Sequence, residues 1–146
     1  MITLAVDNLA GAVTFYRDGL GFETDGVIGT QWTDGRTGAQ GAVALFELEG
    51  GLILSLYARS DLAKDAEIDL GPKQSGEFSL GQLVRTRAEV DELLRKAKAA
   101  GAATTEAHDR PWGIYSGYFR DPDGHLWEVI WNPGRIPPAT TTPTRA

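Results

Sequence analysis

The chain contains no cysteine among its 146 residues. Thiolate metal ligands, cysteine nucleophiles and disulfide bonds are therefore excluded. Long hydrophobic runs are also missing, since no apolar segment approaches the roughly 20 residues that a membrane-spanning helix needs. The N-terminal residues MITLAVD lack the basic and apolar regions of a secretory leader. We expect a soluble, cytoplasmic protein that makes no membrane contact.

Positive charge is scarce and scattered. Fourteen lysines and arginines stand against 20 aspartates and glutamates, which gives a net charge of -6. No basic run is long enough to follow a phosphate backbone, so we expect no nucleic-acid partner, and the acidic balance modestly favours a cationic ligand. The length and the 42% hydrophobic content allow one sizeable core and hence one domain.

The first half of the chain predicts a strand, a helix and three further strands. Alternation over residues 2–6 is typical of a strand, and Asn8 is placed to cap a helix that ends near Gly19. Three strand-like segments follow, with turn signals at the DG and GG pairs: VIGTQWTDG, GAVALFELEGG and LILSLYA.

The same order of elements begins again at Phe78. The segment FSLGQLV reads as a strand, Thr86 and Glu89 form a capping box, and Gly101 ends the helix. The three strand segments that follow are AATTEAH, IYSGYFR and HLWEVIW. The DPDG sequence at 121–124 joins the last two as a tight turn.

This internal repeat determines the expected fold. We expect an α+β protein with two paired βαβββ modules, residues 1–57 and 78–132, whose eight strands form a curved sheet around a cleft with the helices outside. Residues 58–77 are polar and predict a linker between the modules. Residues 133–146 hold four of the seven prolines and little that could pack, which predicts a disordered tail.

Two segments carry a resemblance to a known family. The stretches VDNLAGAVTFYRDGLGFE and GYFRDPDGHLWEVIWNP resemble the vicinal oxygen chelate superfamily, which includes glyoxalase I, extradiol dioxygenases, and bleomycin and fosfomycin resistance proteins. The likeness covers roughly residues 1–133 by the repeat criterion. It implies the paired-module fold, whereas the activity has to be argued from the site.

The resemblance also implies where metal ligands stand in metal-dependent members of the superfamily. One ligand comes from the first strand and one from the last strand of each module, and those positions are Met1, Ser55, Ser79 and Glu128. Glu128 alone is a strong ligand, whereas a divalent site normally needs three or more. We therefore predict no metal and no cofactor, with a divalent metal at Glu128 as the alternative.

The two histidines do not complete a ligand set in this interpretation. His125 lies an odd number of residues from Glu128, so strand geometry directs it to the other face. His108 precedes DRP and is predicted to lie in a polar loop. Surface or turn roles are the more economical interpretation for both.

Glu128 is the candidate catalytic residue. It shares a face with Leu126 and Ile130, whereas Trp127 and Trp131 lie on the other face. A partly desolvated carboxylate in the cup can act as a general base or accept a hydrogen bond from a ligand. Alternatively, Glu128 is retained from a metal-binding ancestor and is satisfied by Ser55 or Ser79.

Aromatic residues supply the candidate walls of the site. Large rings with polar tips suit stacking on a flat ligand. The ligand-binding candidates, including the two serines as polar anchors, are Trp32, Ser55, Tyr57, Ser79, Trp112 and Tyr115. Three other rings are expected in the core: Phe119, Trp127 and Trp131.

Two functions from different classes fit these residues. The first is a metal-free binding protein of the glyoxalase/bleomycin-resistance type that takes a small aromatic or planar molecule. The second is an enzyme, a lyase, isomerase or dioxygenase, that uses Glu128 as a base or recruits a metal through it. A structural module with a filled cup is the third possibility. The resemblance and the exposed sheet edges favour a homodimer.

Overall fold

The computed structural model describes residues 1–73 and 76–139. Within these ranges, no helix is both long and apolar enough to span a membrane. The part of the predicted tail at 133–139 carries no helix or strand. The rest of the tail lies outside the described residues.

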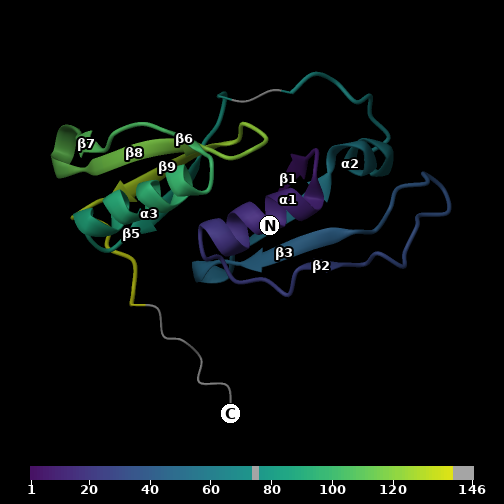
Figure 1. Cartoon of the computed structure of the whole chain (residues 1–146), viewed down its shortest axis with the longest axis horizontal. Helices are drawn as coiled ribbons and strands as arrows, with labels where there is room; N and C mark the ends of the chain where they lie inside the picture. The colour runs from purple at the N-terminus through teal and green to yellow at the C-terminus, as the bar shows by residue number, and fades with distance from the viewer. Residues whose placement is uncertain (74–75, 140–146) are drawn as a thin grey trace, which may run out of the picture. The chain divides into compact units, whose positions relative to one another are not determined.

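The chain folds into two compact units, each with one β-sheet and its own helices (Figure 1). Unit 1 is formed by Met1–Glu77 together with the turn Pro122–His125. Unit 2 is formed by Phe78–Asp121 and the residues from Leu126 onward. In unit 1 the turn is held by a hydrogen bond from the Asp7 amide to Asp123 Oδ1, 2.8 Å long.

The sheet of unit 1 has the strand order β1-β4-β3-β2, with β1 parallel to β4 and the other pairs antiparallel. Its strands are β1 (Ile2–Val6), β2 (Val27–Ile28), β3 (Val43–Glu47) and β4 (Ile53–Ala58). A short 3₁₀ turn, Glu49–Gly51, joins β3 to β4 where the glycine pair predicted a hairpin.

Helix α1 (Leu9–Val13) starts where the sequence predicts. The Asn8 side chain accepts a hydrogen bond from the Gly11 amide at 2.9 Å, as an N-cap does. The helix continues as a π-helical turn, Thr14–Gly19, which buries Tyr16. The Tyr16 ring lies 5.8 Å from the ring of Phe46 on β3, so the aromatic core of unit 1 forms between this turn and the sheet.

The prediction of a long second strand at 27–35 is wrong, since only Val27–Ile28 pair with β3. The chain turns directly after Ile28, where Gly29 takes a left-handed φ of 75° and its carbonyl accepts from the Trp32 amide at 3.1 Å. A glycine adopts this conformation without steric cost, so the strand ends there. Trp32 consequently lies in a turn region and not in mid-strand.

Residues 58–77, predicted as a linker, begin with helix α2 (Arg59–Asp65). Asp61 in its first turn and Lys64 in its last turn suit the helix dipole. Only Ala63 is buried, so the helix has no apolar stripe that a sequence pattern could reveal.

Unit 2 repeats the topology of unit 1 with the order β5-β9-β8-β6. The strands β5 and β9 run parallel, and β9, β8 and β6 run antiparallel. The elements are β5 (Leu80–Val84), α3 (Arg87–Ala99), β6 (Ala103–Thr104), β8 (Tyr115–Arg120) and β9 (Leu126–Trp131). The predicted α+β fold with two βαβββ modules is confirmed.

The strand count differs from the prediction. Across residues 1–73 and 76–139 the structure has nine strands in sheets of four and five, where eight were expected. The additional strand is β7 (His108–Asp109), which pairs with the start of β8. Two residues are too short for a period-two signal, so the sequence predicted a loop at this position.

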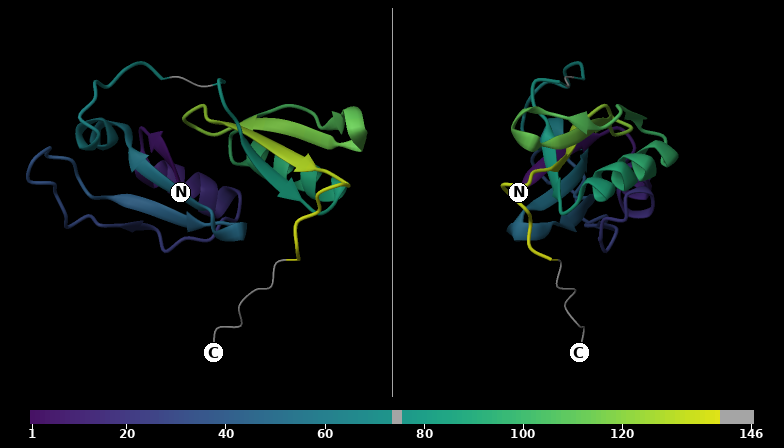
Figure 2. Two further views of the ribbon diagram at one scale, coloured as in Figure 1. Left: turned by 180° about the vertical axis from the view of Figure 1, so that it is seen from behind. Right: turned by 90° about the vertical axis from the view of Figure 1, so that its left-hand side faces the viewer.

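Helix α3 begins with the predicted capping box, which is confirmed. The Glu89 amide donates to Thr86 Oγ1 at 3.2 Å, and the Arg85 amide donates to Glu89 Oε2 at 2.7 Å. The helix covers one face of β8 and β9 (Figure 2), and Val90 is fully buried there.

Two of the three rings predicted for the core are fully confirmed. Phe119 and Trp127 are buried and stack in parallel with their ring centroids 5.9 Å apart. Trp131 is half-buried, and the guanidinium of Arg87 lies 5.8 Å from its ring centroid.

Gly117 on β8 allows α3 to approach the sheet. A Cβ at this position would lie 2.6 Å from Leu94 Cδ1 and 3.2 Å from the Ala107 backbone. We predict that Gly117→Ala lowers the free energy of unfolding by about 1–3 kcal/mol, as overpacking does. Chemical denaturation measures the change.

Gly81→Ala is the matched control in the same sheet. Its Cβ would meet only Ile130 Cδ1, at 3.4 Å, which is ordinary contact. This variant should stay within about 0.5–1 kcal/mol of the parent, because Gly81 has no close backbone neighbour and alanine is tolerated in a strand. Equal stability of the two variants would contradict the packing described here.

Candidate functional site

Successive side chains of strand β9 point to opposite faces of the sheet, so one carboxylate on this strand faces away from the hydrophobic core. Trp127 and Val129 are buried on the side of α3, so Glu128 between them lies on the opposite face. In the sheet register, Glu128 stands beside Gly81 of β5 and Tyr118 of β8. We call this surface of the unit 2 sheet, opposite α3, the Glu128 face.

The Glu128 carboxylate is held by its neighbours on β8. Ser116 Oγ donates a hydrogen bond to Glu128 Oε1 at 2.8 Å, and Ser116 is fully buried. The sequence had offered Ser55 or Ser79 as the partner, and within unit 2 the hydrogen bond comes from Ser116 on the adjacent strand of the same hairpin. Because the Ser116 hydroxyl is buried and donates to Glu128, this hydrogen bond fixes the orientation of the carboxylate.

Tyr118 is the second neighbour of Glu128. Burial raises the pKa of its phenol above the ordinary value of 10.0, and the charge of Glu128 and a hydrogen bond to it act in the same direction. Arg110 acts in the opposite direction. Tyr118 therefore stays protonated, so it remains a neutral hydrogen-bond donor to Glu128.

A cation stands on the same face. The Arg110 guanidinium lies 5.7 Å from the ring centroid of Tyr118. Its Nε atom is buried and has no hydrogen-bond partner in the described part of the chain. The Arg110 amide donates to the Ile114 carbonyl at 2.7 Å, which closes the loop between β7 and β8 and positions the side chain.

His108 also lies on the Glu128 face, where the sequence predicted a loop. It is paired in register with Ser116, so the two side chains point to the same side of the sheet. His108 itself is exposed, and its Nδ1 lies 3.5 Å from the Glu106 carbonyl oxygen.

Ser55 and Tyr57 occupy the equivalent face in unit 1. Ser55 is buried and stands between Thr3 and Leu45, as Glu128 stands between its own two strand neighbours. The Tyr57 hydroxyl donates to the Gln40 carbonyl at 2.7 Å. Ser79 is exposed directly before β5, with the strand parity of Gly81.

The remaining aromatic candidates differ in their surroundings. Trp32 is 67% exposed and Trp112 is 90% exposed. Trp112 has a φ of 65°, a left-handed conformation that costs a bulky residue about 1–2 kcal/mol. Tyr115 lies on the α3 side, where its hydroxyl donates to Asp91 at 2.7 Å and Arg87 stacks 4.1 Å from its ring.

The sequence interpretation missed Ser116, Tyr118 and Arg110. A usable signal was present for the first two. The tight turn at 121–124 fixes the hairpin register, in which Arg120 pairs with Leu126 and Tyr118 with Glu128. Ser116 lies two residues before Tyr118 on the same strand, so its side chain is predicted to point to the same face. Arg110 gave no such signal, because its position depends on β7.

The residues at the ligand positions of metal-dependent relatives do not fit a bound divalent ion. Apart from Glu128 they offer the thioether of Met1 and the hydroxyls of Ser55 and Ser79, which are weak donors for such ions. Within residues 1–73 and 76–139, no three histidine, aspartate and glutamate side chains are grouped closely enough to hold a metal. The metal-free site stays a prediction.

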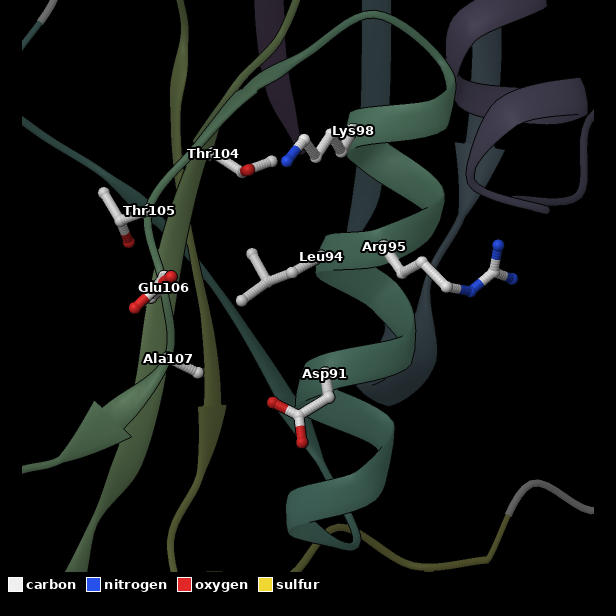
Figure 3. Close-up of a pocket in the computed structure, with 8 residues that line it drawn as sticks. All are labelled: Asp91, Leu94, Arg95, Lys98, Thr104, Thr105, Glu106 and Ala107. Atoms are coloured by element: carbon white, nitrogen blue, oxygen red, sulfur yellow. The ribbon is translucent and has the colours of Figure 1, made fainter.

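A shallow hollow lies elsewhere in unit 2, between α3 and residues 104–107 (Figure 3). It has Leu94 and Ala107 in its wall and charged side chains of both signs at its rim, including Lys98 and Glu106. It opens beside α3, so it is separate from the Glu128 face.

The Glu128–Tyr118 pair predicts a measurable titration. Replacing the carboxylate in Glu128→Gln removes a charge that raises the Tyr118 pKa, so that pKa should fall toward its ordinary value while the burial effect remains. NMR titration of ring-labelled tyrosine resolves each phenol. The matched control is Asp91→Asn, which should lower the pKa of Tyr115 alone, because a hydrogen bond to Asp91 is the main cause of its rise. An unchanged Tyr118 pKa in Glu128→Gln would contradict the pairing.

Comparison with known proteins agrees with the geometry. The chain is similar to a glyoxalase-related enzyme from Fulvimarina pelagi, with 28% identity, a TM-score of 0.73, and coverage of 90% of this chain and 86% of that one. It is similar to lactoylglutathione lyase from Agrobacterium tumefaciens, with 27% identity, a TM-score of 0.61, and coverage of 89% and 90%.

A fosfomycin resistance protein from Listeria monocytogenes shares the fold at 21% identity, with a TM-score of 0.63 and coverage of 90% of this chain and 89% of that one. A search of curated proteins gave no match. The sequence model of one family matches residues 1–129. The chain therefore belongs to the Glyoxalase/Bleomycin resistance protein/Dioxygenase superfamily.

Proposed function

We propose that this chain binds a small planar or aromatic molecule on the Glu128 face without a metal ion. The hydrogen bond from buried Ser116 to Glu128 carries the proposal. This bond orders the carboxylate before a ligand binds, so less conformational entropy is lost on binding. The remaining lone pairs of the carboxylate are free in principle to accept a donor group of the ligand.

The surroundings of Glu128 suit a flat molecule. Leu126 and Ile130 flank it on β9, and Leu83 of β5 pairs in register with Ile130. All three are half-buried, and the Tyr118 ring lies beside them in register. Small-molecule sites combine such apolar walls with a few placed polar groups.

Of the ligand-binding residues predicted from the sequence, the proposal keeps all but one. Ser55, Tyr57 and Ser79 stay candidate contacts because their strand positions match those of the Glu128 face. Tyr57 would contribute its ring, since its hydroxyl is engaged. The exposed rings of Trp32 and Trp112 also stay candidates. We omit Tyr115, because Asp91 and Arg87 hold it on the α3 side.

A second candidate function is a lyase or isomerase in which Glu128 transfers a proton. The observation that favours it is the contact between Glu128 and the phenol of Tyr118, since paired carboxylates and phenols serve in general acid and base catalysis. The similarity to a lactoylglutathione lyase is compatible with this function.

We further propose that the chain acts in the cytoplasm as a homodimer. Strand β2 is the outer strand of the unit 1 sheet, and its residues Val27 and Ile28 are exposed. Unprotected apolar edges favour association. Native mass spectrometry reports the oligomer, any retained metal and any ligand carried through purification in one spectrum.

The binding proposal predicts a localised response. Titration with hydroxylated benzene derivatives should shift the NMR amide signals of Ser116, Tyr118 and Glu128 and leave Asp91 and Thr104 unshifted. Prior treatment with a chelator should not change the affinity. Glu128→Gln should weaken binding by roughly tenfold or more, the worth of one hydrogen bond to a charged group. Responses confined to the α3 side, or affinity lost with the chelator, would refute the proposal.

The enzyme alternative has its own readout. If Glu128 is a base, a substrate is converted by the parent protein and Glu128→Gln loses turnover by about a hundredfold or more, the range of general base catalysis. In a pure binding protein the ligand is recovered unaltered from both. Product analysis by mass spectrometry separates the two functions.

A further inference from the structure

We infer that the ligand of the Glu128 face carries a carboxylate or a similar planar oxyanion, and that Arg110 binds this group. The inference rests on the proposed function and specifies the chemistry of its ligand. It identifies Arg110 as the positively charged residue of the site, whereas the sequence analysis had named only polar and aromatic residues as ligand contacts.

Arg110 is distinguished in the described structure by a buried side-chain donor that has no acceptor. Its Nε is buried without a hydrogen-bond partner in residues 1–73 and 76–139. Five other arginines make ion pairs with carboxylates: Arg17, Arg36, Arg59, Arg87 and Arg95. An arginine stays charged and carries five N–H donors. A buried donor without an acceptor is an exception that calls for a partner.

The side chain is placed on the Glu128 face by the loop that follows β7. Asp109 pairs with Tyr115 and lies on the α3 side, where it meets Arg87. The next residue, Arg110, therefore points to the other side of the sheet, and its guanidinium lies over the Tyr118 ring. This contact holds the guanidinium in position without using its N–H donors.

Glu128 does not neutralise Arg110. No ion pair joins the two in the described structure, and Tyr118 contacts both, through its ring on one side and its hydroxyl on the other. The face therefore presents a cation at one end and a carboxylate acceptor at the other. A planar ring with an oxyanion at one end and a hydroxyl donor at the other matches this arrangement.

The charge of Arg110, which lies close to the ligand, outweighs the net negative charge of the chain. The net charge of -6 led to an expected cationic ligand, but charges beyond about 10 Å are screened at moderate ionic strength. Arg110 acts at contact distance, and its planar fork suits two parallel hydrogen bonds to a carboxylate.

The test compares two probes of nearly equal shape, 3-hydroxybenzoate and its neutral analogue 3-hydroxybenzamide, at neutral pH. Affinities come from amide-resolved NMR titration of the full chain, read at Ser116, Tyr118 and Glu128. The parent should bind the carboxylate about tenfold or more tightly than the amide, since hydrogen bonds between charged partners are about twice as strong as neutral ones. Arg110→Gln should abolish this preference, because it lowers the affinity for 3-hydroxybenzoate much more than that for 3-hydroxybenzamide.

Two further variants keep the test decisive. Arg95→Gln removes the same charge from α3 and should retain the full preference for the carboxylate. Arg110→Lys keeps the charge without the planar fork and should retain part of it, and it replaces Arg110→Gln as the deciding variant if thermal melting shows that the latter does not fold.

The outcomes separate the inference from the proposed function. If the parent binds both probes equally well, or if the deciding Arg110 variant keeps the full preference of the parent, Arg110 does not recognise the ligand, although the Glu128 face still binds planar molecules. If neither probe shifts these amides, the proposed function fails and the inference fails with it.

Discussion

The site depends on one constraint, that a charged residue in the middle of a half-buried strand must be satisfied on its own side of the sheet. On β9 the hydrophobic residues that pack under α3 alternate with Glu128. An unpaired carboxylate there would cost several kcal/mol. The hydroxyls of Ser116 and Tyr118, supplied by the neighbouring strand, remove that penalty. The same contacts that make the strand stable also present an oriented acceptor.

The two modules share their topology and differ in chemistry. In both, a parallel pair of strands lies beside an antiparallel pair in the same order. At the matching positions unit 1 has buried Ser55 where unit 2 has Glu128. In unit 2, Arg110 joins Glu128 on this face. The superfamily fold fixes where such residues stand, and individual substitutions decide what they bind.

The sequence predicts the repeat because hydrophobic alternation, the caps at Asn8 and Thr86, and the DPDG turn are all local signals. They establish the order of the main elements and the face of Glu128. Where the prediction failed, the cause was local bonding or missing periodicity. The turn at Gly29 shortens the second strand, while α2 and β7 bury too little to leave a pattern.

The partners of the candidate site were harder to predict than its centre. Glu128 follows from its strand alone, and Ser116 and Tyr118 follow once the hairpin register is worked out. Arg110 depends on the two-residue strand β7 and on a loop in which Trp112 takes a left-handed conformation. No pattern in the sequence marks that geometry, so the cation of the site could be found only from the structure.

The central claim is that Glu128 is held by Ser116 and Tyr118 to meet an organic ligand and not a metal ion. A crystal structure of the protein incubated with zinc or manganese, with anomalous scattering recorded for the metal, tests it most directly. The claim predicts that Ser116 Oγ still donates to Glu128 and that no anomalous density lies beside the carboxylate. An ion bonded to Glu128 and to three further protein donors would contradict it.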